Sequence, residues 1–430
     1  MRRIVLAALT FTLVLPLAAA RRRAVDPPPV DVPAAEWLRA SAYPFATTAA
    51  RSGLDDLAAL SAIVGDARIV SLGEATHGSA EFFTMKHRIL EYLVERKGFT
   101  VFAIEANLPE ADAVDDYVLH GKGSAAAALR GMYFWTWDTA EVLDMIEWMR
   151  EYNLRRGDRP PVRFRGFDAQ FVHGALPRLD EYVRRVDPDR ASAFSALYDC
   201  VRGFNQPSRY VALPAATRNA CATKLAAAFD TFHARRDEYV SRSSEAEYTN
   251  QLRYARVVVQ AEATWSNRGN RDHFMAENVE WLAGTAHPGE KLVLWAHNGH
   301  VATDSTFRMG GALRPRFGAG MVVFGFAFDR GGFTSNGPSG LGPQSVAQGP
   351  AEGWEVFFRQ AGLPRFMLDL RRPWAPQAAA LVRQPQRMWS IGSVWDPANV
   401  ATRHRFAVAL ANAYDVMIYI EVVTATRLNR

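Results

Sequence analysis

Residues 68–107 read RIVSLGEATHGSAEFFTMKHRILEYLVERKGFTVFAIEAN, and this stretch decides the fold class. Residues 68–73 and 99–105 are short runs rich in β-branched and aromatic side chains, apolar on both faces as buried parallel strands are. Between them, residues 79–97 carry apolar side chains at helical spacing. Strands that alternate with helices in this way predict an α/β fold with a parallel sheet.

The rest of the chain extends this pattern. A second helical pattern covers 138–156, and from about 176 to 284 helical spacing continues without any strand-like run. We therefore predict a mostly parallel central sheet flanked by helices, with a large helical insertion at 176–284 that acts as a cap. Residues 331–350, dense in Gly, Ser and Pro, are predicted to be a long loop. The further strand-like runs are 162–168, 291–297, 321–328, 365–370 and 414–423.

The first 20 residues have the features of a secretory signal peptide. Two arginines precede an apolar run that ends in Ala18-Ala19-Ala20, a small-residue cleavage site. Residues 21–36 are predicted to be a Pro-rich linker, which leaves one domain at 37–430. The protein would then be exported, to the periplasm or as a secreted protein. An uncleaved N-terminal anchor is the alternative, because the apolar run is only slightly shorter than a spanning helix and three arginines follow it.

Composition and charge narrow the choice of partner. The 430 residues are 49% hydrophobic and 22% charged, as in an ordinary globular protein, and the formal net charge is only +5. Without a basic stripe that carries interleaved aromatic residues, nucleic acid is not an expected partner. We also expect no stable membrane partner once the signal is cleaved. Cys200 and Cys221 would form a disulfide in an exported protein, and two buried free thiols are the alternative.

Acidic or histidine side chains follow four of the predicted strands. In an open parallel sheet, ligands bind beyond the carboxyl ends of the strands, so these endings are expected to meet at one edge. Any single carboxylate there could instead cap the following helix. The four endings are Gly73-Glu74-Ala75-Thr76-His77, Glu105-Ala106-Asn107, Gly166-Phe167-Asp168-Ala169-Gln170 and Ala296-His297-Asn298-Gly299-His300.

The first and last of these endings suggest acid–base chemistry. A turn can bring Glu74 and His77 to one point, where the carboxylate would orient the imidazole and stabilise its charged form, as in a general base. Of His297 and His300, one could bind substrate or a metal while the other donates to an oxyanion. The alternative for each pair is a structural role, as polar residues of a loop or as histidines that satisfy backbone groups.

A metal site is a second interpretation of the same residues. Three histidines with two or three carboxylates are suitable ligands for zinc, manganese or iron, and the set would be Glu74, His77, Glu105 and His297. The sequence contains no H-E-x-x-H helix and no CxxC pair. It also lacks the G-x-S-x-G elbow of serine hydrolases and any phosphate-binding glycine loop between a strand and a helix.

The endings also carry a family resemblance. Gly73-Glu74-Ala75-Thr76-His77-Gly78, Glu105 and Ala296-His297-Asn298-Gly299-His300 resemble the conserved segments of the erythromycin esterase family. The stretch from Asn270 to Asn278, which contains Arg271-Asp272, is similar to a further segment of that family. The resemblance covers roughly residues 50–425. It implies hydrolysis of an ester by a water that a histidine activates, and in the best known members the ester is the lactone of macrolide antibiotics, whose cleavage gives antibiotic resistance.

The resemblance assigns roles to particular residues. His77 would be the general base, Glu74 its orienting partner, and Glu105, His297 and His300 the remaining wall of the site. The family often has an arginine in the helix after the histidine, and here the candidates are Lys86, which departs from that pattern, and Arg88. The residues predicted to bind substrate or stabilise the oxyanion are Lys86, Arg88, Asp168, Arg271 and Asn298.

We therefore predict a hydrolase that cleaves a small-molecule carboxylic ester or lactone and requires no cofactor. One alternative is a metal-dependent hydrolase that uses a divalent ion at the same histidine and glutamate cluster. Another is a non-catalytic protein that binds haem or a metal through these histidines.

Overall fold

The computed structural model describes residues 32–204, 207–372 and 376–429. The predicted signal peptide and the linker as far as residue 31 lie outside this range. Residues 32–36, the predicted end of the linker, belong to helix α1 (Val32–Ser41). Over the described ranges, no helix is both long enough and apolar enough to cross a membrane.

The described chain divides into two compact units. The first unit comprises Thr100–Phe134 and Ile146–Leu292. The second unit comprises the described residues up to Phe99, Trp135–Met145, and the residues from Val293 onward. Helix α6 (Ala140–Arg155) contributes residues to both.

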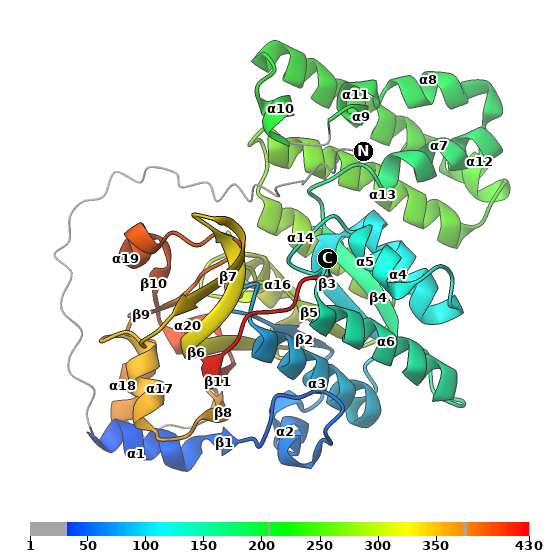
Figure 1. The fold of residues 1–430 in the computed structure, drawn as a ribbon. Coiled ribbons are helices and arrows are strands. Elements are labelled where there is room, and N and C mark those ends of the chain that lie inside the picture. Colours follow the sequence, from blue (N-terminus) through cyan, green and yellow to red (C-terminus); the bar gives the residue numbers. More distant parts are fainter. Residues whose placement is uncertain (1–31, 205–206, 373–375, 430) are drawn as a thin grey trace. The chain divides into compact units, whose positions relative to one another are not determined.

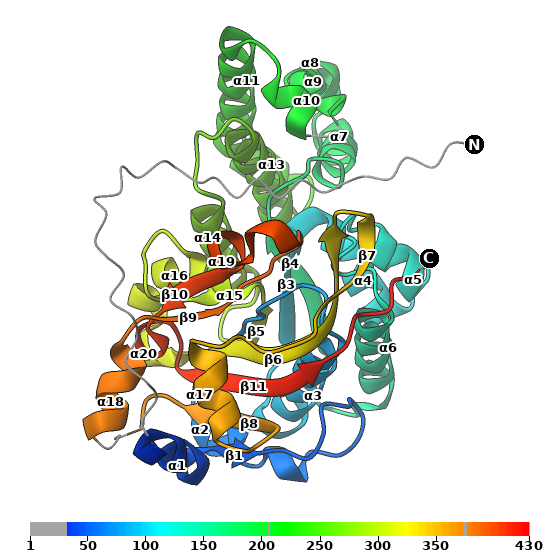
Figure 2. The same cartoon turned by 60° about the vertical axis from the view of Figure 1, so that its left-hand side comes forward.

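Parallel strands form the centre of the second unit. Strand β6 (Met321–Gly337) pairs in parallel with β2 (Ile69–Leu72) and with β11 (Val416–Val423), and Figure 2 shows β6 and β11 side by side. Strand β5 (Leu292–Trp295) lies on the other side of β2. The edge of the sheet beyond β11 is antiparallel: β8 (Arg365–Asp369) pairs with β11, and β1 (Tyr43–Pro44) pairs with β8.

Helices cover this sheet. A small separate sheet is formed by β9 (Gln386–Trp389) and β10 (Arg405–Val408), which pair in antiparallel orientation. Helix α3 (Ala80–Lys97) has clear signals at both ends. Its N-cap is Ser79, whose hydroxyl accepts from Phe82 N, and its C-cap is Gly98 in the left-handed conformation. The helices of the second unit, besides α1, are α2 (Leu60–Val64), α3 (Ala80–Lys97), α15 (Asn298–Val301), α16 (Met309–Phe317), α17 (Trp354–Gln360), α18 (Pro376–Arg383), α19 (Val400–Arg403) and α20 (Leu410–Ala413).

The first unit combines two parallel strands with a helical region. Strand β3 (Val101–Asn107) pairs with β4 (Arg163–Asp168). The structure joins Cys200 to Cys221 in a disulfide across 5.7 Å between their Cα atoms. The helices, drawn in cyan and green in Figure 1, are α4 (Leu108–His120), α5 (Ala125–Arg130), α7 (Ala175–Val186), α8 (Ala191–Ala196), α9 (Asp199–Arg202), α10 (Pro207–Val211), α11 (Ala215–Ala234), α12 (Arg236–Ser241), α13 (Glu245–Trp265) and α14 (Arg271–Trp281).

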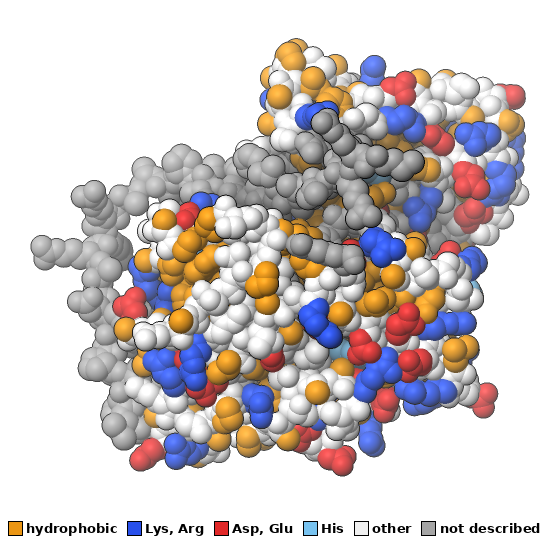
Figure 3. Space-filling model, in the orientation of Figure 1, with side chains coloured by type: hydrophobic (Ala, Val, Ile, Leu, Met, Phe, Trp, Pro, Cys, Tyr) orange, Lys and Arg blue, Asp and Glu red, His pale blue; other side chains and the backbone are white. Residues whose placement is uncertain are grey.

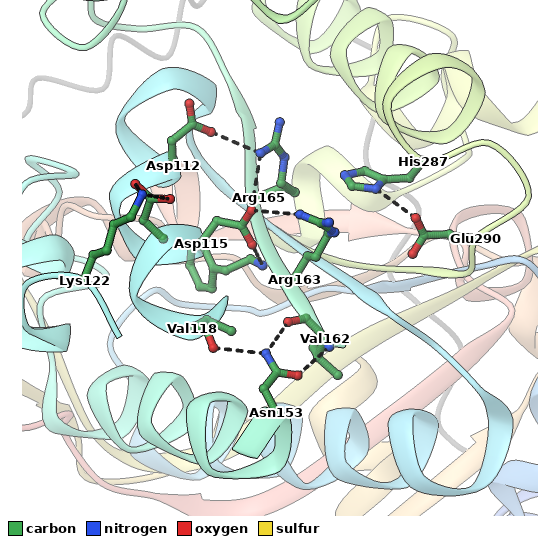
Figure 4. A network of polar contacts seen from close by, with 12 residues as sticks. Asp112, Asp115, Val118, Lys122, Asn153, Val162, Arg163, Arg165, His287 and Glu290 are labelled. Atoms are coloured by element: carbon green, nitrogen blue, oxygen red, sulfur yellow. Dashed lines mark hydrogen bonds and ion pairs between the residues drawn. The ribbon is translucent and has the colours of Figure 1, made fainter. Parts of the chain in front are cut away.

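A polar network holds the strands of the first unit to its helices. Asp115 on α4 accepts from the backbone N–H of Phe164 on β4, and Asp112 pairs with Arg165 (Figure 4). The hydroxyl of Tyr254 on α13 donates to Asp112 as well. The network therefore ties the long helix α13 to β4 as well as to α4.

The surface of the helical region is covered by mixed charges. Figure 3 shows Lys and Arg side chains next to Asp and Glu side chains on the face of this region that it draws. Many of these charges are in ion pairs, such as Arg185 with Glu247 and Arg236 with Glu245. Exposed pairs of this kind contribute little to stability, about 0 to 1 kcal/mol each.

The predicted fold class is confirmed, with one local correction. The sheet is mostly parallel, each predicted strand is present, and the predicted helical region is the series α7–α13. The predicted loop at 331–350 is wrong, because β6 continues to Gly337 and pairs with β7 (Gly340–Val346) in a hairpin. Backbone pairing and the buried side chain of Phe333 hold this polar, glycine-rich stretch as strands.

Candidate active site

A buried carboxylate is the centre of a polar cluster in the second unit. The Glu74 cluster comprises Glu74, His77, Lys86, Trp295 and His297. Glu74 is the second residue after β2, and its side chain is fully buried. Its carboxylate faces His77 Nδ1 at 2.6 Å and accepts from Lys86 Nζ at 2.5 Å and Trp295 Nε1 at 2.8 Å. All three neighbours can donate, so they satisfy Glu74 as an acceptor-only carboxylate.

This geometry selects the tautomer of His77. The carboxylate of Glu74 accepts a hydrogen bond from Nδ1–H, so the lone pair of the neutral imidazole is on Nε2. His77 is buried, with 7% of its surface exposed, and its ring lies 5.7 Å from that of Trp137 in an edge-on arrangement. The predicted pairing of Glu74 with His77 is therefore present, in the orientation that a general base requires.

His297 lies beside His77, and its hydrogen bond favours the other tautomer of the neutral ring. Its Nδ1 accepts from the backbone N–H of Gly299 at 3.1 Å, so the proton of the neutral ring is on Nε2. The ring centroids of His77 and His297 are 5.2 Å apart. His300 follows on α15, with its ring centroid 6.4 Å from that of His297. A hydrogen-bond acceptor and a donor are thus presented by two neighbouring imidazoles.

Asn298 and two glycines hold the backbone of this site. The Asn298 amide donates to Phe326 O at 2.8 Å and accepts from Phe326 N at 3.0 Å, so it anchors the segment after β5 to β6. A Cβ atom on Gly73 would lie 2.2 Å from Asn298 Oδ1, and one on Gly78 would lie 1.9 Å from Thr334 O. Asn298 was predicted to bind substrate, whereas its amide here positions the site.

The two basic residues predicted on α3 have different surroundings. Lys86 is fully buried against Glu74, and its ammonium also lies 4.3 Å from the centroid of the Trp295 ring. Arg88 instead donates to Thr47 O, Gly53 O and Asp56. Helix residues two apart lie on roughly opposite faces, so Lys86 and Arg88 cannot both face Glu74. The structure thus brings Lys86, and not Arg88, to the Glu74 cluster.

Aromatic side chains surround the cluster. Trp137 and Phe83 pack on Trp295 with ring centroids 5.7 and 4.8 Å apart. Sequence reasoning missed both Trp137 and Trp295 as members of the site. For Trp295 a signal was available, since it precedes the Ala296-His297 pair at the end of a strand, whereas nothing in the sequence near Trp137 pointed to His77.

The predicted residues of the first unit form a second group. The Arg271 cluster comprises Glu105, Asp168 and Arg271. Arg271 Nη2 donates to Glu105 at 2.7 Å and to Asp168 at 2.7 Å, and Nε donates to Asp168 at 3.0 Å. Asp168 is fully buried and also accepts from Gln170 Nε2 at 2.6 Å. Arg271 is the first residue of α14, whose N-cap is Asn270.

Burial and charge act in opposite directions on Arg271. Burial by itself lowers the pKa of the guanidinium, but the Asp168 and Glu105 carboxylates more than offset this, and the pKa lies above its ordinary value. The guanidinium therefore stays charged and holds both carboxylates. Such a cluster fixes the positions of its side chains and contains no imidazole.

Across the residues that the structure describes, no group of three or more His, Cys, Asp or Glu side chains is arranged to hold a metal ion.

Comparison with known proteins defines the class of protein. The family model described as erythromycin esterase matches residues 94–423, so the chain belongs to the erythromycin esterase family and is a hydrolase of that family.

The chain is also similar to particular relatives and to one solved structure. The chain is 24% identical over 292 residues to erythromycin esterase type II of Escherichia coli, covering 62% of this chain and 68% of the relative. It is 25% identical over 295 residues to the putative hydrolase YbfO of Bacillus subtilis, covering 63% of this chain and 64% of the relative. The alignments thus span about two thirds of these relatives. A solved Bacillus cereus protein superposes with a TM-score of 0.84 at 26% identity, over 94% of this chain and all of that one.

Proposed function

We propose that the chain hydrolyses a carboxylic ester or lactone with a water that His77 activates. The observation that carries the proposal is the contact of 2.6 Å between the buried Glu74 carboxylate and His77 Nδ1. This contact leaves Nε2 of His77 as the proton acceptor. Membership of the erythromycin esterase family supports the ester as the bond that is cleaved.

The chemical steps follow from the two imidazoles. His77 Nε2 takes a proton from water as the water oxygen bonds to the carbonyl carbon, and the carbonyl oxygen becomes an oxyanion. The oxyanion then reforms the carbonyl, the bond to the alcohol oxygen breaks, and that oxygen takes the proton from Nε2. A carboxylic acid and an alcohol are released, or a single hydroxy acid when the substrate is a lactone.

Glu74 and His297 each stabilise one of the two charges that develop during these steps. The Glu74 carboxylate stabilises the imidazolium that forms when His77 accepts the proton. His297 Nε2 carries the proton of its neutral ring and can donate to the oxyanion. A donor placed in this way contributes roughly 3 to 4 kcal/mol to transition-state stabilisation.

The substrate class and the location of the protein belong to the same proposal. The relative named erythromycin esterase type II makes the macrolide lactone ring the first substrate to examine. Export to the periplasm or the exterior agrees with the Cys200–Cys221 disulfide, because disulfides persist in oxidising compartments.

The test compares wild type with His77→Asn on a panel of aryl esters, alkyl esters and macrolide lactones. We expect His77→Asn to lower kcat/KM by roughly 10²–10⁴-fold, the usual contribution of a general base. His120→Asn, at the exposed C-terminal end of α4, is the matched control and should keep full activity.

Each alternative predicts a different result in the same experiment. Undiminished turnover by His77→Asn would rule out the base assignment. Loss of wild-type activity on chelation, with recovery on adding a divalent ion, would favour the metal-dependent hydrolase. Stoichiometric haem or metal in a protein that turns over no ester or lactone would favour the non-catalytic alternative.

A further inference from the structure

The helical region of the first unit contains a cavity that the proposed reaction does not use. It has a volume of about 320 Å³, and its walls come from α11, α12, α13 and α14 and from Thr285. Arg253 and Arg256 of α13 line it with Glu277 and Trp281 of α14. A cavity of this size is at the small end of the range for organic ligands.

The charges on the cavity wall do not balance. Arg256 binds Glu277 through Nε at 3.0 Å and Nη2 at 2.8 Å, and Arg253 Nη1 donates to the same carboxylate at 2.9 Å. Two guanidiniums therefore share one carboxylate. The remaining charged pair on the wall, Arg236 with Glu245, is neutral as a whole, so three arginines and two glutamates leave a net charge of +1.

Both guanidiniums that bind Glu277 have N–H donors that make no hydrogen bond to Glu277. The described residues provide no hydrogen-bond acceptor for Nε or Nη2 of Arg253, or for Nη1 of Arg256. The side chain of Arg253 is only 13% exposed, so water has limited access to it. Burial lowers the pKa of Arg253, and Glu277 only partly offsets this effect. A second anion in the cavity would satisfy these donors and compensate the charge.

Aromatic side chains complete the wall. The Arg253 guanidinium lies 5.2 Å from the centroid of the Trp281 ring, and the buried ring of Tyr248 lines the same cavity. An apolar ring or short chain would pack against these faces while its anionic group meets the arginines.

We propose that this cavity binds a small carboxylate that carries an apolar ring or chain, through Arg253, Arg256 and Trp281. A planar guanidinium binds a carboxylate with two parallel hydrogen bonds, which fits the unused edge of Arg253. The proposal does not depend on the reaction assigned to His77.

The test is calorimetric titration of the full chain with benzoate as the probe and benzamide as its neutral analogue of similar shape. We expect one benzoate per chain and at least about tenfold weaker binding of benzamide, because the amide lacks the charge that the arginines recognise. Arg256→Gln, at a side chain 32% exposed, should weaken benzoate about tenfold and Trp281→Leu severalfold. Arg185→Gln, a paired surface arginine on α7, is the control and should bind benzoate as wild type does.

Several outcomes would overturn the proposal. These are no binding of benzoate up to about 10 mM, equal binding of benzamide, and unchanged binding by Arg256→Gln and Arg253→Gln when both are folded. Binding that His77→Asn abolishes and Arg256→Gln leaves intact would place benzoate at the Glu74 cluster and also overturn it. Because benzoate binding is measured without turnover, its failure is distinct from any failure of the ester proposal.

Discussion

The Glu74 cluster and the Arg271 cluster both place buried carboxylates at or near the carboxyl ends of parallel strands, yet they are suited to different tasks. Glu74 faces an imidazole, a group that takes and releases protons near neutral pH. Glu105 and Asp168 face a guanidinium, which keeps its proton throughout that range. The comparison teaches that a carboxylate at a strand end acquires its role from the cation beside it.

The largest expected effect concerns the stability of the Arg271 cluster. Arg271→Gln leaves two buried carboxylates without their shared cation, and removing one partner of a buried ion pair costs roughly 3 to 5 kcal/mol. We expect this loss in the free energy of unfolding measured with urea. Arg185→Gln, whose surface pair with Glu247 lies in the same unit, should cost less than about 1 kcal/mol.

The division of roles between the two clusters would be contradicted if Arg271→Gln had the free energy of unfolding of wild type but lost esterase activity. Arg271 would then act on the substrate, as the sequence predicted, and the two clusters would share the chemistry.

The second effect is on catalysis by the Glu74 cluster. Glu74→Gln removes the charge that stabilises the imidazolium and can present a donor to His77 Nδ1, so we expect kcat to fall by about 10²–10³-fold. Steady-state kinetics on the best ester of the panel measures the loss. Asp168→Asn is the matched change in the other cluster, and we expect it to affect the free energy of unfolding more than kcat. Equal losses of kcat in the two variants would contradict the division of roles.

A third test contrasts His77, whose ring faces a carboxylate, with a histidine whose ring accepts from a backbone N–H. The buried ring of His404 accepts from the backbone N–H of Asp396 at Nε2, at 2.8 Å. Burial, followed by the charge of Arg403, lowers the pKa of His404 from 6.5 to about 4. His404 is therefore held neutral.

The sign of the pH dependence follows from that shift. The folded state binds the proton more weakly than the unfolded state, so the contribution of His404 to stability is complete above pH 6.5 and is lost as the pH falls towards 4. Between pH 7 and 4.5 the wild type should lose roughly 1 to 3 kcal/mol more than His404→Gln, whose amide oxygen can still accept from Asp396. Parallel stability curves for the two proteins would contradict the assignment of His404 as neutral.

The smallest effect on stability is expected from removing one indole N–H donor in each unit. Trp295→Phe removes the Nε1 hydrogen bond to Glu74, and Trp265→Phe removes the matched bond to the backbone carbonyl of Gln170. Each should cost about 1 to 2 kcal/mol of stability. We expect only Trp295→Phe to lower kcat as well, by less than about tenfold, because Glu74 loses one of the groups that orient it. A similar fall in kcat for Trp265→Phe would weaken the comparison.

Much of the fold could be predicted from local patterns. Apolar runs such as 321–328 and 414–423 identified buried strands, since a parallel strand is apolar on both faces. The hairpin that β7 forms with the end of β6 was missed because backbone pairing, which leaves no apolar pattern, holds most of it. Helical spacing was enough to predict that Arg88 and Lys86 lie on different faces of α3. No pattern in the sequence predicted that Trp137 lies beside His77.

The sequence by itself determined which residue types end each strand and the alternation of strands with helices, because composition and periodicity are local properties. The local turn already brings His77 to Glu74, but the long-range partners of each carboxylate depend on tertiary packing. Glu74 obtains two of its three donors from 12 and 221 residues away, and Arg271 reaches carboxylates 103 and 166 residues distant. Side chains so far apart in the chain meet only through the packing of whole helices and strands, and that packing placed an ammonium and an indole beside Glu74 and a guanidinium beside Asp168, whereas the imidazole beside Glu74 is three residues away on the same turn.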